Sequence, residues 1–386
     1  MTRRRLLVLA STFPARPGDG TPEFVADLAG QEAEDFETLV VAPMVGDGAR
    51  LESQRGYRVH RFRYFPRRWQ DLADGAIIEN LRKRPSRWLQ VVPFVLAETL
   101  ATWRAVRSGR PDVIHAHWIV PQGIVAALVA PRTPTLITTL GGDLYALNAG
   151  PLRALKSWML GRAAYVTVMN AEMAAKVVEL GADPAKVEVV PMGADLSTVR
   201  PRTDGDGVEA RLLFVGRLVE KKGLAVLLDA LRRLDDVAWR LTVIGDGPLR
   251  DELEAMAPDG AEFVGKQGRE ALREAYASAD IAIFPSMPSS SGDQDGLPVA
   301  MLEAMGAGCA VIASDLPGIS EAIADGADGV LVPPRDEAAL AGAIRALVAD
   351  PAARDRLGRA AAATAREQYS KEAIGERYRG ILRRLV

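Results

Sequence analysis

Short apolar runs alternate with helical patterns along almost the whole chain. Examples are RLLVLAS (5–11), TLVVAP (38–43), LTVIGDGPL (241–249) and IAIF (281–284). Continuous apolar runs of this length, bounded by loop residues, are typical of strands buried on both faces. Strands that alternate with helices predict an α/β fold with doubly wound parallel sheets. A chain of 386 residues is long enough for two such domains.

Composition narrows the class of protein. Hydrophobic residues make up 48% of the chain and charged residues 25%, as in ordinary globular proteins. The single cysteine, Cys309, excludes internal disulfides and multi-cysteine metal sites. The net charge is −2, and residues 1–198 carry 24 basic against 20 acidic side chains. Nucleic acid is therefore not an expected partner, because such a protein needs a strongly basic domain.

The N-terminal sequence MTRRRLLVLAST has a basic start and a short apolar run, as a signal peptide does. The run spans only about five residues, so a first strand is the better interpretation. No apolar stretch of about 18 residues predicts a transmembrane helix. A cytoplasmic protein is expected.

A loop and a helix start, at residues 286–317, follow the IAIF run. The loop is rich in Ser, Gly and Asp, and Pro298 then opens a helical pattern, as proline does well at a first helical position. Asp295 precedes this helix, and Glu303 lies eight positions later, on its first or second turn. A strand, a glycine-containing loop and a helix N-terminus can hold phosphate. The alternative is an ordinary loop whose acids cap the helix.

Two further loops of the C-terminal half suit a diphosphate. The segment RLLFVGRLVEKKGLAVLLDAL (211–231) predicts a strand, a tight loop and a helix, with Arg217 and Lys222 five positions apart. Cations at the carboxyl end of a strand, near a helix N-terminus, can bind phosphates; a solvated charged loop is the alternative. The glycines of LTVIGDGPL would let the backbone approach a ligand closely.

The N-terminal half contains a pair of histidines in DVIHAHWIVPQG (112–123). Period two places His115 and His117 on the same side of the predicted strand. They could ligate a metal, but a third ligand is not evident, since His60 is the only other histidine. The next predicted strand, TLITTLGGDLYAL (135–147), ends in Gly-Gly-Asp.

Three of these motifs resemble those of the family-4 retaining glycosyltransferases. An acid, seven residues and Glu303, followed by Ala-Met and Gly, look like the family signature. The run GRLVxxKG is similar to the family's diphosphate clamp, and HAHW followed by Gly123 looks like its first-domain motif. The resemblance spans nearly all the chain and is strongest over 191–334. It implies an α/β fold of GT-B architecture, in which two doubly wound Rossmann-like domains face each other across a cleft.

The chain departs from the family pattern at three places. Asp295 stands where the family usually has Glu, and Leu140 stands where it often has His. Gly296, Leu297 and Pro298 replace a common Gly-Phe-Gly, and Pro298 has no N–H to offer a phosphate. This variant resembles the branch that makes exopolysaccharides and glycolipids.

The resemblance implies a role for each matching residue. His117 and Asp295 would be the catalytic residues that position the sugar, and Asp143 would contact the acceptor or support the structure. The residues implied in donor binding are Gly20, Gly216, Arg217, Lys222, Gly245, Val264, Gly296, Leu297, Val299 and Glu303. Glu303 would hold the ribose, and His115 would pack in the core.

The expected reaction transfers a sugar, with retention, from a nucleotide-diphosphate sugar to a hydroxyl of a glycan, a lipid-linked sugar or a small molecule. No cofactor or metal is expected. Asp293-Gln294-Asp295 matches a metal-binding Asp-x-Asp formally, but two cations and a helix N-terminus can meet the leaving-group charge. Two alternatives stay open: a GT-B nucleotide-sugar epimerase, and a non-catalytic nucleotide-sugar binding protein.

The expected domains are residues 1–198 on the acceptor side and 207–368 on the donor side. By resemblance, a last helix at 369–386 packs back on the first domain. The polar, glycine-rich TDGDG at 203–207 is the predicted linker.

Residues 61–110 carry eleven Lys and Arg against four acids, interleaved with tryptophan and phenylalanine. A basic, aromatic and partly helical segment can lie on an anionic membrane surface. The alternative is a solvated helical face whose aromatic residues lie in the core. The first interpretation predicts a peripheral protein on the inner face of the cell membrane.

Overall fold

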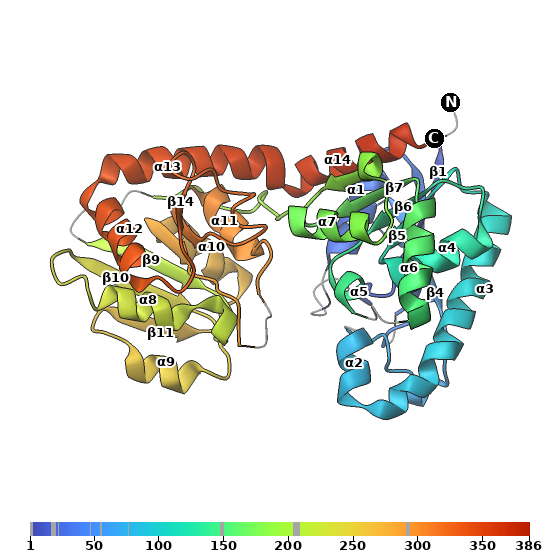
Figure 1. Ribbon diagram of the computed structural model, residues 1–386, viewed down its shortest axis with the longest axis horizontal. Helices are drawn as coiled ribbons and strands as arrows, with labels where there is room; N and C mark the ends of the chain where they lie inside the picture. Colours follow the sequence, from blue (N-terminus) through green and yellow to red (C-terminus); the bar gives the residue numbers. More distant parts are fainter. Residues whose placement is uncertain are drawn as a thin grey trace. The chain divides into compact units, whose positions relative to one another are not determined.

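The computed structural model describes residues 3–16, 21, 23–46, 48–54, 56–75, 77–146, 150–203, 209–290 and 294–386. It divides the chain into two compact units (Figure 1). The first contains Met1–Pro191 and Ile374–Val386, and the second contains Met192–Ala373. The boundaries expected from the sequence lay at 198 and 368, and most of the expected linker falls outside the described residues.

The first unit is built on an eight-stranded sheet. In spatial order its strands are β3 (Leu51–Gln54), β4 (Tyr57–Phe62), β2 (Glu37–Pro43), β1 (Arg5–Leu9), β5 (Val113–His117), β6 (Thr135–Thr138), β7 (Tyr165–Val168) and β8 (Val187–Val189). Every neighbouring pair is parallel except β3 and β4, which form an antiparallel edge.

The helices of the first unit connect these strands. They are α1 (Phe24–Glu32), α2 (Ile77–Lys83), α3 (Val91–Gly109), α4 (Ile124–Val129), α5 (Gly142–Tyr145), α6 (Gly150–Arg162), α7 (Ala171–Glu179) and, from Ile374 onward, α14 (Lys371–Arg384). Four short helical turns accompany them: η1 (Arg67–Trp69), η2 (Pro85–Gln90), η3 (Ile119–Gly123) and η4 (Pro184–Lys186).

Helices cover both faces of this sheet. In β1, Leu6 and Val8 join a buried cluster with residues of α1 and α14, whereas Leu7 and Leu9 join a cluster with residues of α3. Successive side chains of a strand point to opposite faces, so both faces must be apolar. The predicted doubly wound arrangement is confirmed here, and α14 packs on the first unit as the resemblance implied.

The second unit is built on a six-stranded sheet whose neighbouring strands are all parallel. In spatial order these are β11 (Ala261–Gly265), β10 (Trp239–Ile244), β9 (Ala210–Val215), β12 (Ile281–Phe284), β13 (Ala310–Ser314) and β14 (Val330–Val332). Its helices are α8 (Leu224–Leu231), α9 (Arg250–Met256), α10 (Arg269–Ser278), α11 (Val299–Ala307), α12 (Glu337–Ala349) and α13 (Pro351–Thr364), with short turns η5 (Glu220–Lys222) and η6 (Ala365–Tyr369).

The alternation seen in β1 recurs in β9. Leu213 faces one buried cluster, and Leu212 and Phe214 face the other. The predicted helix start at Pro298 needs a correction of one residue. Pro298 has ψ 125° and is the extended residue before the helix, which begins at Val299. None of the described helices is long and apolar enough to cross a membrane.

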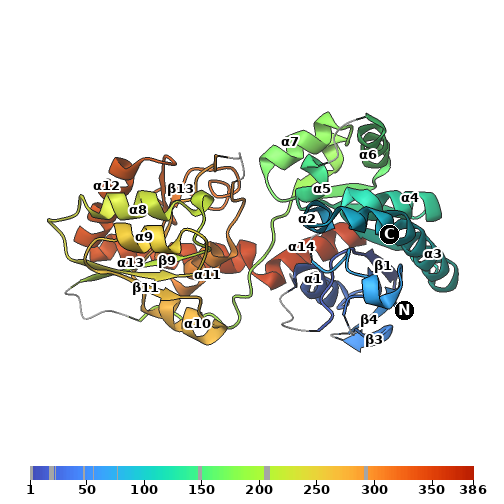
Figure 2. The ribbon, with the colours of Figure 1, turned by 90° about the horizontal axis from the view of Figure 1, so that it is seen from below.

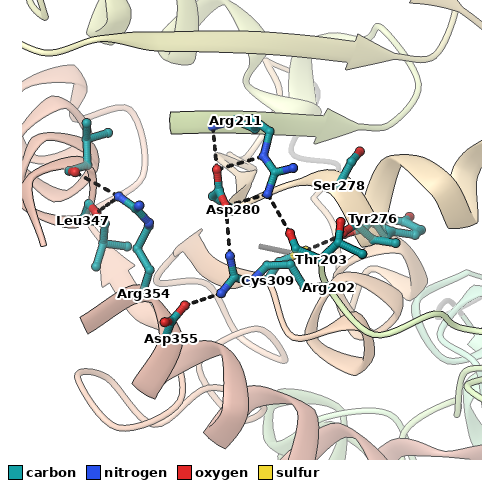
Figure 3. A network of polar contacts seen from close by, with 12 residues as sticks. Arg202, Thr203, Arg211, Tyr276, Ser278, Asp280, Cys309, Leu347, Arg354 and Asp355 are labelled. Atoms are coloured by element: carbon teal, nitrogen blue, oxygen red, sulfur yellow. Dashed lines mark hydrogen bonds and ion pairs between the residues drawn. The ribbon is translucent and has the colours of Figure 1, made fainter. Parts of the chain in front are cut away.

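A buried carboxylate, Asp280, joins several segments of the second unit (Figure 3). Its oxygens accept hydrogen bonds from the backbone N–H of Arg211 at 2.9 Å and from the Arg211 and Arg202 guanidinium groups. Arg202 also forms an ion pair with Asp355 of α13. Burial raises the pKa of Asp280, but the hydrogen bonds from Arg211 outweigh burial and bring the pKa below its usual value. The ionised carboxylate, which directly precedes β12, thus binds both Arg211 of β9 and Arg202, and Arg202 extends the contact to α13.

Candidate functional site

Three loops of the second unit leave the carboxyl ends of neighbouring parallel strands. They follow β9, β10 and β12, and their described residues are 216–223, 245–249, 285–290 and 294–298. In a parallel sheet these ends lie at one edge, where doubly wound proteins bind ligands. One edge of this sheet therefore carries four residues that were predicted separately from three motifs: Arg217, Lys222, Gly245 and Asp295.

Glycines allow these loops to pack backbone against backbone. A Cβ atom at Gly245 would lie 1.8 Å from the carbonyl oxygen of Gly216, and one at Gly223 would lie 1.8 Å from that of Pro285. Real Cβ atoms do not approach so closely, so only glycine fits. Close approach to a ligand was the predicted reason for the glycine at 245; the structure shows that contact between loops already requires it.

Lys222 and Asp295 form an ion pair in this structure. The Lys222 Nζ atom lies 2.8 Å from Asp295 Oδ2, and Lys221 Nζ lies 3.7 Å from Oδ1. Ser286 Oγ donates a second hydrogen bond to Oδ2 at 2.8 Å. Asp295 is only 9% exposed, so these contacts offset the cost of burying its carboxyl group. The residue predicted to hold phosphate and the residue predicted to position sugar are thus direct neighbours.

The loop after β12 is further fixed to the loop after β9. Glu220 accepts hydrogen bonds from the backbone N–H and the hydroxyl of Ser290, at 3.0 and 2.8 Å. Arg335 lies 3.8 Å from Glu220 and donates to the carbonyl of Pro288. Lys222 and Asp295 therefore lie on loops that hold each other in place.

Arg217 differs from Lys222 in its surroundings. Its side chain is exposed, and it forms no hydrogen bond or ion pair with any residue in the described ranges. Arg217 lies on the same loop as Lys222, and a guanidinium with its donors open to solvent can bind an anion.

Glu303 lies on the second turn of α11, as predicted, with its carboxyl group held from α10. Tyr276 OH donates a hydrogen bond to Glu303 Oε2 at 3.0 Å. Burial raises the pKa of Glu303, and the hydrogen bond from Tyr276 partly offsets that rise. The second carboxyl oxygen accepts no hydrogen bond from a described residue, so it is the free acceptor of this group.

The other predicted donor-binding residues of this unit lie in β11 and at the start of α11. Val264 lies near the end of β11, where its carbonyl accepts a hydrogen bond from Gln267 at 2.6 Å. Gly296 is exposed, Leu297 packs partly against the core, and Val299 begins α11 with 41% of its surface exposed.

In the first unit, His115 is a core residue. Its Nδ1 lies 2.6 Å from Glu32 Oε1, and its Nε2 lies 2.7 Å from Thr138 Oγ1. Burial lowers the pKa of His115 to about 3 and raises the pKa of Glu32, so burial disfavours the charged form of each group. Thr138 continues the network to Thr167 at 2.6 Å. The predicted packing role of His115 agrees with these contacts.

His117 lies on the same face of β5, with its ring 4.1 Å from that of His115. It is fully buried, yet neither ring nitrogen has a hydrogen-bond partner among the described residues. Burial, then the adjacent His115 ring, holds the pKa of His117 well below its usual value. A neutral imidazole with one donor and one acceptor unused suits a ligand hydroxyl. Gly20, predicted to contact the donor, lies outside the described residues.

Asp143 has its oxygens engaged within the first unit. The backbone N–H of Ile119 and the hydroxyl of Thr139 each donate to it at 2.6 Å. These bonds fix the chain directly after β5, and the group is only 6% exposed. Of the two roles considered, the contacts favour structural support, and the acceptor role stays a prediction.

No group of three or more His, Cys, Asp or Glu side chains in the described ranges could hold a metal ion. Asp293, half of the formal Asp-x-Asp, lies outside those ranges. Three residues that contact the predicted ones were not themselves predicted: Ser286, Tyr276 and Lys221. Lys221 adjoins a predicted residue and Ser286 lies in the predicted loop, but no motif spacing marks any of the three.

Both units have the doubly wound architecture of GT-B proteins. HepE from Anabaena, whose structure was solved in complex with UDP, superposes with a TM-score of 0.72 and 18% identity over 98% of this chain and 100% of that one. Two family models also match: the glycosyl transferase 4-like domain over residues 20–193, and glycosyl transferases group 1 over 209–350.

Relatives with glycosyltransferase and glycogen synthase names agree with these matches. The D-inositol 3-phosphate glycosyltransferase of Nocardia farcinica is 31% identical over 335 residues, 75% of this chain and 71% of that protein. Glycogen synthase of Mycobacterium tuberculosis is 33% identical over 276 residues (66% and 64%), and the putative colanic acid biosynthesis glycosyltransferase WcaL of Salmonella typhimurium is 34% identical over 176 residues (44% and 43%). The chain thus spans less than two thirds of the last two relatives. It belongs to the group 1 glycosyltransferases with a glycosyl transferase 4-like N-terminal domain, and the predicted family and fold are confirmed.

The glycine contacts predict which substitutions damage the site's framework. Gly245→Ala should destabilise the second unit by about 2 kcal/mol or more, because the new methyl group overlaps a carbonyl at a φ of +149°. Gly296→Ala is the matched control, since nothing lies within 4 Å of its added Cβ atom. Its stability should stay within about 0.5 kcal/mol of the parent. Thermal unfolding measures both, and equal melting temperatures for the two variants would contradict the packing argument.

Proposed function

We propose that this protein is a retaining glycosyltransferase that moves a sugar from a nucleotide-diphosphate sugar to an acceptor hydroxyl without a metal. The observation that carries the proposal is the Lys222–Asp295 pair, held by interlocked loops at the carboxyl edge of a parallel sheet. It joins a phosphate-binding cation to a carboxylate suited to a sugar. Because the chain belongs to a glycosyltransferase family, we infer that the Lys222–Asp295 pair serves in glycosyl transfer.

The diphosphate of the donor would bind Arg217, Lys222 and the N-terminus of α11. Arg217 has its donors available, and Lys222 already lies in a partly buried position. Backbone N–H groups at the start of a helix add positive potential. Together they would stabilise the charge that develops on the departing nucleoside diphosphate.

Asp295 and His117 would position the transferred sugar. A carboxylate near the ring steadies the positive charge that develops there and accepts a hydrogen bond from a hydroxyl. The unused nitrogens of His117 would bind another hydroxyl group. We propose front-face attack by the acceptor, assisted by the leaving phosphate and without a protein nucleophile; orientation then supplies much of the rate.

Glu303 would bind the ribose through the carboxyl oxygen that Tyr276 leaves free. HepE was crystallised with UDP, which makes UDP-sugars the first donors to test. The name of the relative WcaL refers to an exopolysaccharide, so glycans and lipid-linked sugars are the first acceptors to test.

A donor panel tests the proposed function. UDP-, GDP-, ADP- and dTDP-sugars are screened by thermal shift, where a ligand at 100 times its dissociation constant stabilises by about 2.7 kcal/mol. Products are then analysed with and without acceptor. Transfer only with acceptor, with the anomeric configuration retained, supports the proposal; donor epimerised without acceptor, or donor bound and left unchanged, would refute it.

Removing either proposed phosphate cation should reduce transfer. Lys222→Ala and Arg217→Ala each remove a charge-assisted contact of roughly 1.5–3 kcal/mol, so kcat/KM should fall about tenfold to a hundredfold. Arg240→Ala is the control, because Arg240 pairs with Glu209 at the surface. Activity near that of the parent in both site variants would remove them from the diphosphate site.

Asp295 and Glu303 should fail in different ways. Glu303→Ala removes a contact made in both the ground and transition states, so the donor KM should rise most. Asp295→Asn keeps the size and removes the charge, so kcat should fall with a smaller change in donor KM. Steady-state kinetics with varied donor separate the two. The division is wrong if Asp295→Asn keeps the parental kcat while Glu303→Ala leaves donor KM unchanged.

Transfer is expected to proceed without a divalent metal, because Arg217, Lys222 and α11 would balance the leaving-group charge. The rate in excess EDTA should match that of the untreated protein. Loss of activity in EDTA and recovery with Mn²⁺ or Mg²⁺ would restore the Asp293-Gln294-Asp295 interpretation.

A further inference from the structure

Helix α3 is apolar on two opposite faces. Its buried face packs on the sheet through Phe94, Ala101 and Ala105. The opposite face, which we call the outer face, consists of large apolar side chains three or four positions apart along η2 and α3: Leu89 (73% exposed), Val92 (66%), Leu96 (64%), Leu100 (45%) and Trp103 (46%). Residues at this spacing share one side of a helix. A helix that is apolar all round is expected to be covered on both sides.

Charge is confined to the ends of this outer face. Between Arg87 and Arg104 the only charged residue is Glu98, which lies on the buried face, with its carboxyl group 2.8 Å from Gln122 Nε2. Burial raises the pKa of Glu98 to about 8. No acid therefore interrupts the outer face.

Basic and aromatic residues flank the leucines. Arg84, with 70% of its side chain exposed, lies before the face, and Arg104 and Arg107 follow it. Trp88 and Trp103 mark its two ends, and the Arg107 guanidinium lies 5.3 Å from the Trp103 ring. Tryptophan and arginine at the ends of a leucine-rich stripe are typical of a helix lying in a membrane interface.

We propose that the outer face of α3 binds the surface of an anionic membrane, with the helix axis in the plane of that surface. Leu89, Val92, Leu96 and Leu100 would enter the boundary between headgroups and acyl chains, and the terminal arginines would contact lipid phosphates. The face is about 20 Å long, from 14 steps of 1.5 Å. Figures 1 and 2 show α3 beside α4 in the first unit.

The charges at the ends of the outer face favour a lipid surface over a second copy of this chain as its binding partner. Both ends of the face are basic, so pairing two copies, parallel or antiparallel, would bring arginines together. Like charges at such a contact oppose association. An anionic lipid surface complements both ends at once.

The experiment uses the full chain and lipid vesicles, and it does not depend on the proposed enzymatic activity. Co-sedimentation is measured with phosphatidylcholine vesicles containing about a quarter phosphatidylglycerol, and with phosphatidylcholine alone, at about 0.15 M salt. The protein should bind the anionic vesicles and release as salt is raised. Leu96→Glu should lower the partition coefficient at least about tenfold, since burying a leucine shifts an equilibrium by that factor or more.

Leu51→Glu is the matched control, because Leu51 is 72% exposed on the edge strand β3, outside the outer face. It should bind vesicles like the parent, and circular dichroism should show both variants folded. The proposal is overturned if the parent stays in the supernatant, or if both variants lose binding equally. It is also overturned if light scattering without lipid shows a dimer that Leu96→Glu dissociates, since the occupant is then a second copy.

Discussion

The carbonyl oxygens of Gly216 and Pro285 occupy the space where side chains at Gly245 and Gly223 would lie. This constraint brings the loops after β9, β10 and β12 into backbone contact at one edge of the sheet. The described residues of the loop after β12 are also held by Glu220, which accepts hydrogen bonds from Ser290. The charged groups of the site are placed by packing that the glycines permit.

The Lys222–Asp295 pair has a consequence for the proposed donor chemistry. In this structure Asp295 forms ion pairs with Lys222 and Lys221 and accepts a hydrogen bond from Ser286. A diphosphate that binds Lys222 competes with the carboxylate, which then becomes available to a sugar hydroxyl. Arg217, exposed and open to solvent, can attract the anion before this exchange. Under the proposed function, binding of the diphosphate to Lys222 would therefore be coupled to loosening of the Asp295 carboxylate.

The sequence predicted the architecture well because the strongest signals are periodic. Apolar runs such as those of β1, β9 and β12 must be covered on both faces, and parallel strands carry their loops to one edge. The β3–β4 hairpin was missed, since the LESQ run of β3 has no apolar alternation and its first residue, Leu51, is exposed. The spacing of Asp295 and Glu303 was sufficient to place one before and one within the same helix start, as the structure has them. Tyr276, the partner of Glu303 on another helix, was not predictable, because a hydrogen bond between separate elements leaves no pattern along the chain. Ser286 was not predictable either, because it is one of several serines in the loop that contains Asp295.

The two histidines of β5 show where periodicity stops being informative. Period two correctly places His115 and His117 on one face, and both are fully buried with their pKa lowered by burial. Burial alone therefore does not distinguish them. Their hydrogen bonds do, because Glu32 and Thr138 satisfy both nitrogens of His115, whereas His117 finds no partner among the described residues. Leaving a buried polar group unpaired costs about 1–3 kcal/mol. The fold satisfies the imidazole of His115 fully and leaves His117, two residues on at the carboxyl end of the strand, without a partner among the described residues. This difference is what supports His117, and not His115, as the proposed ligand-binding histidine.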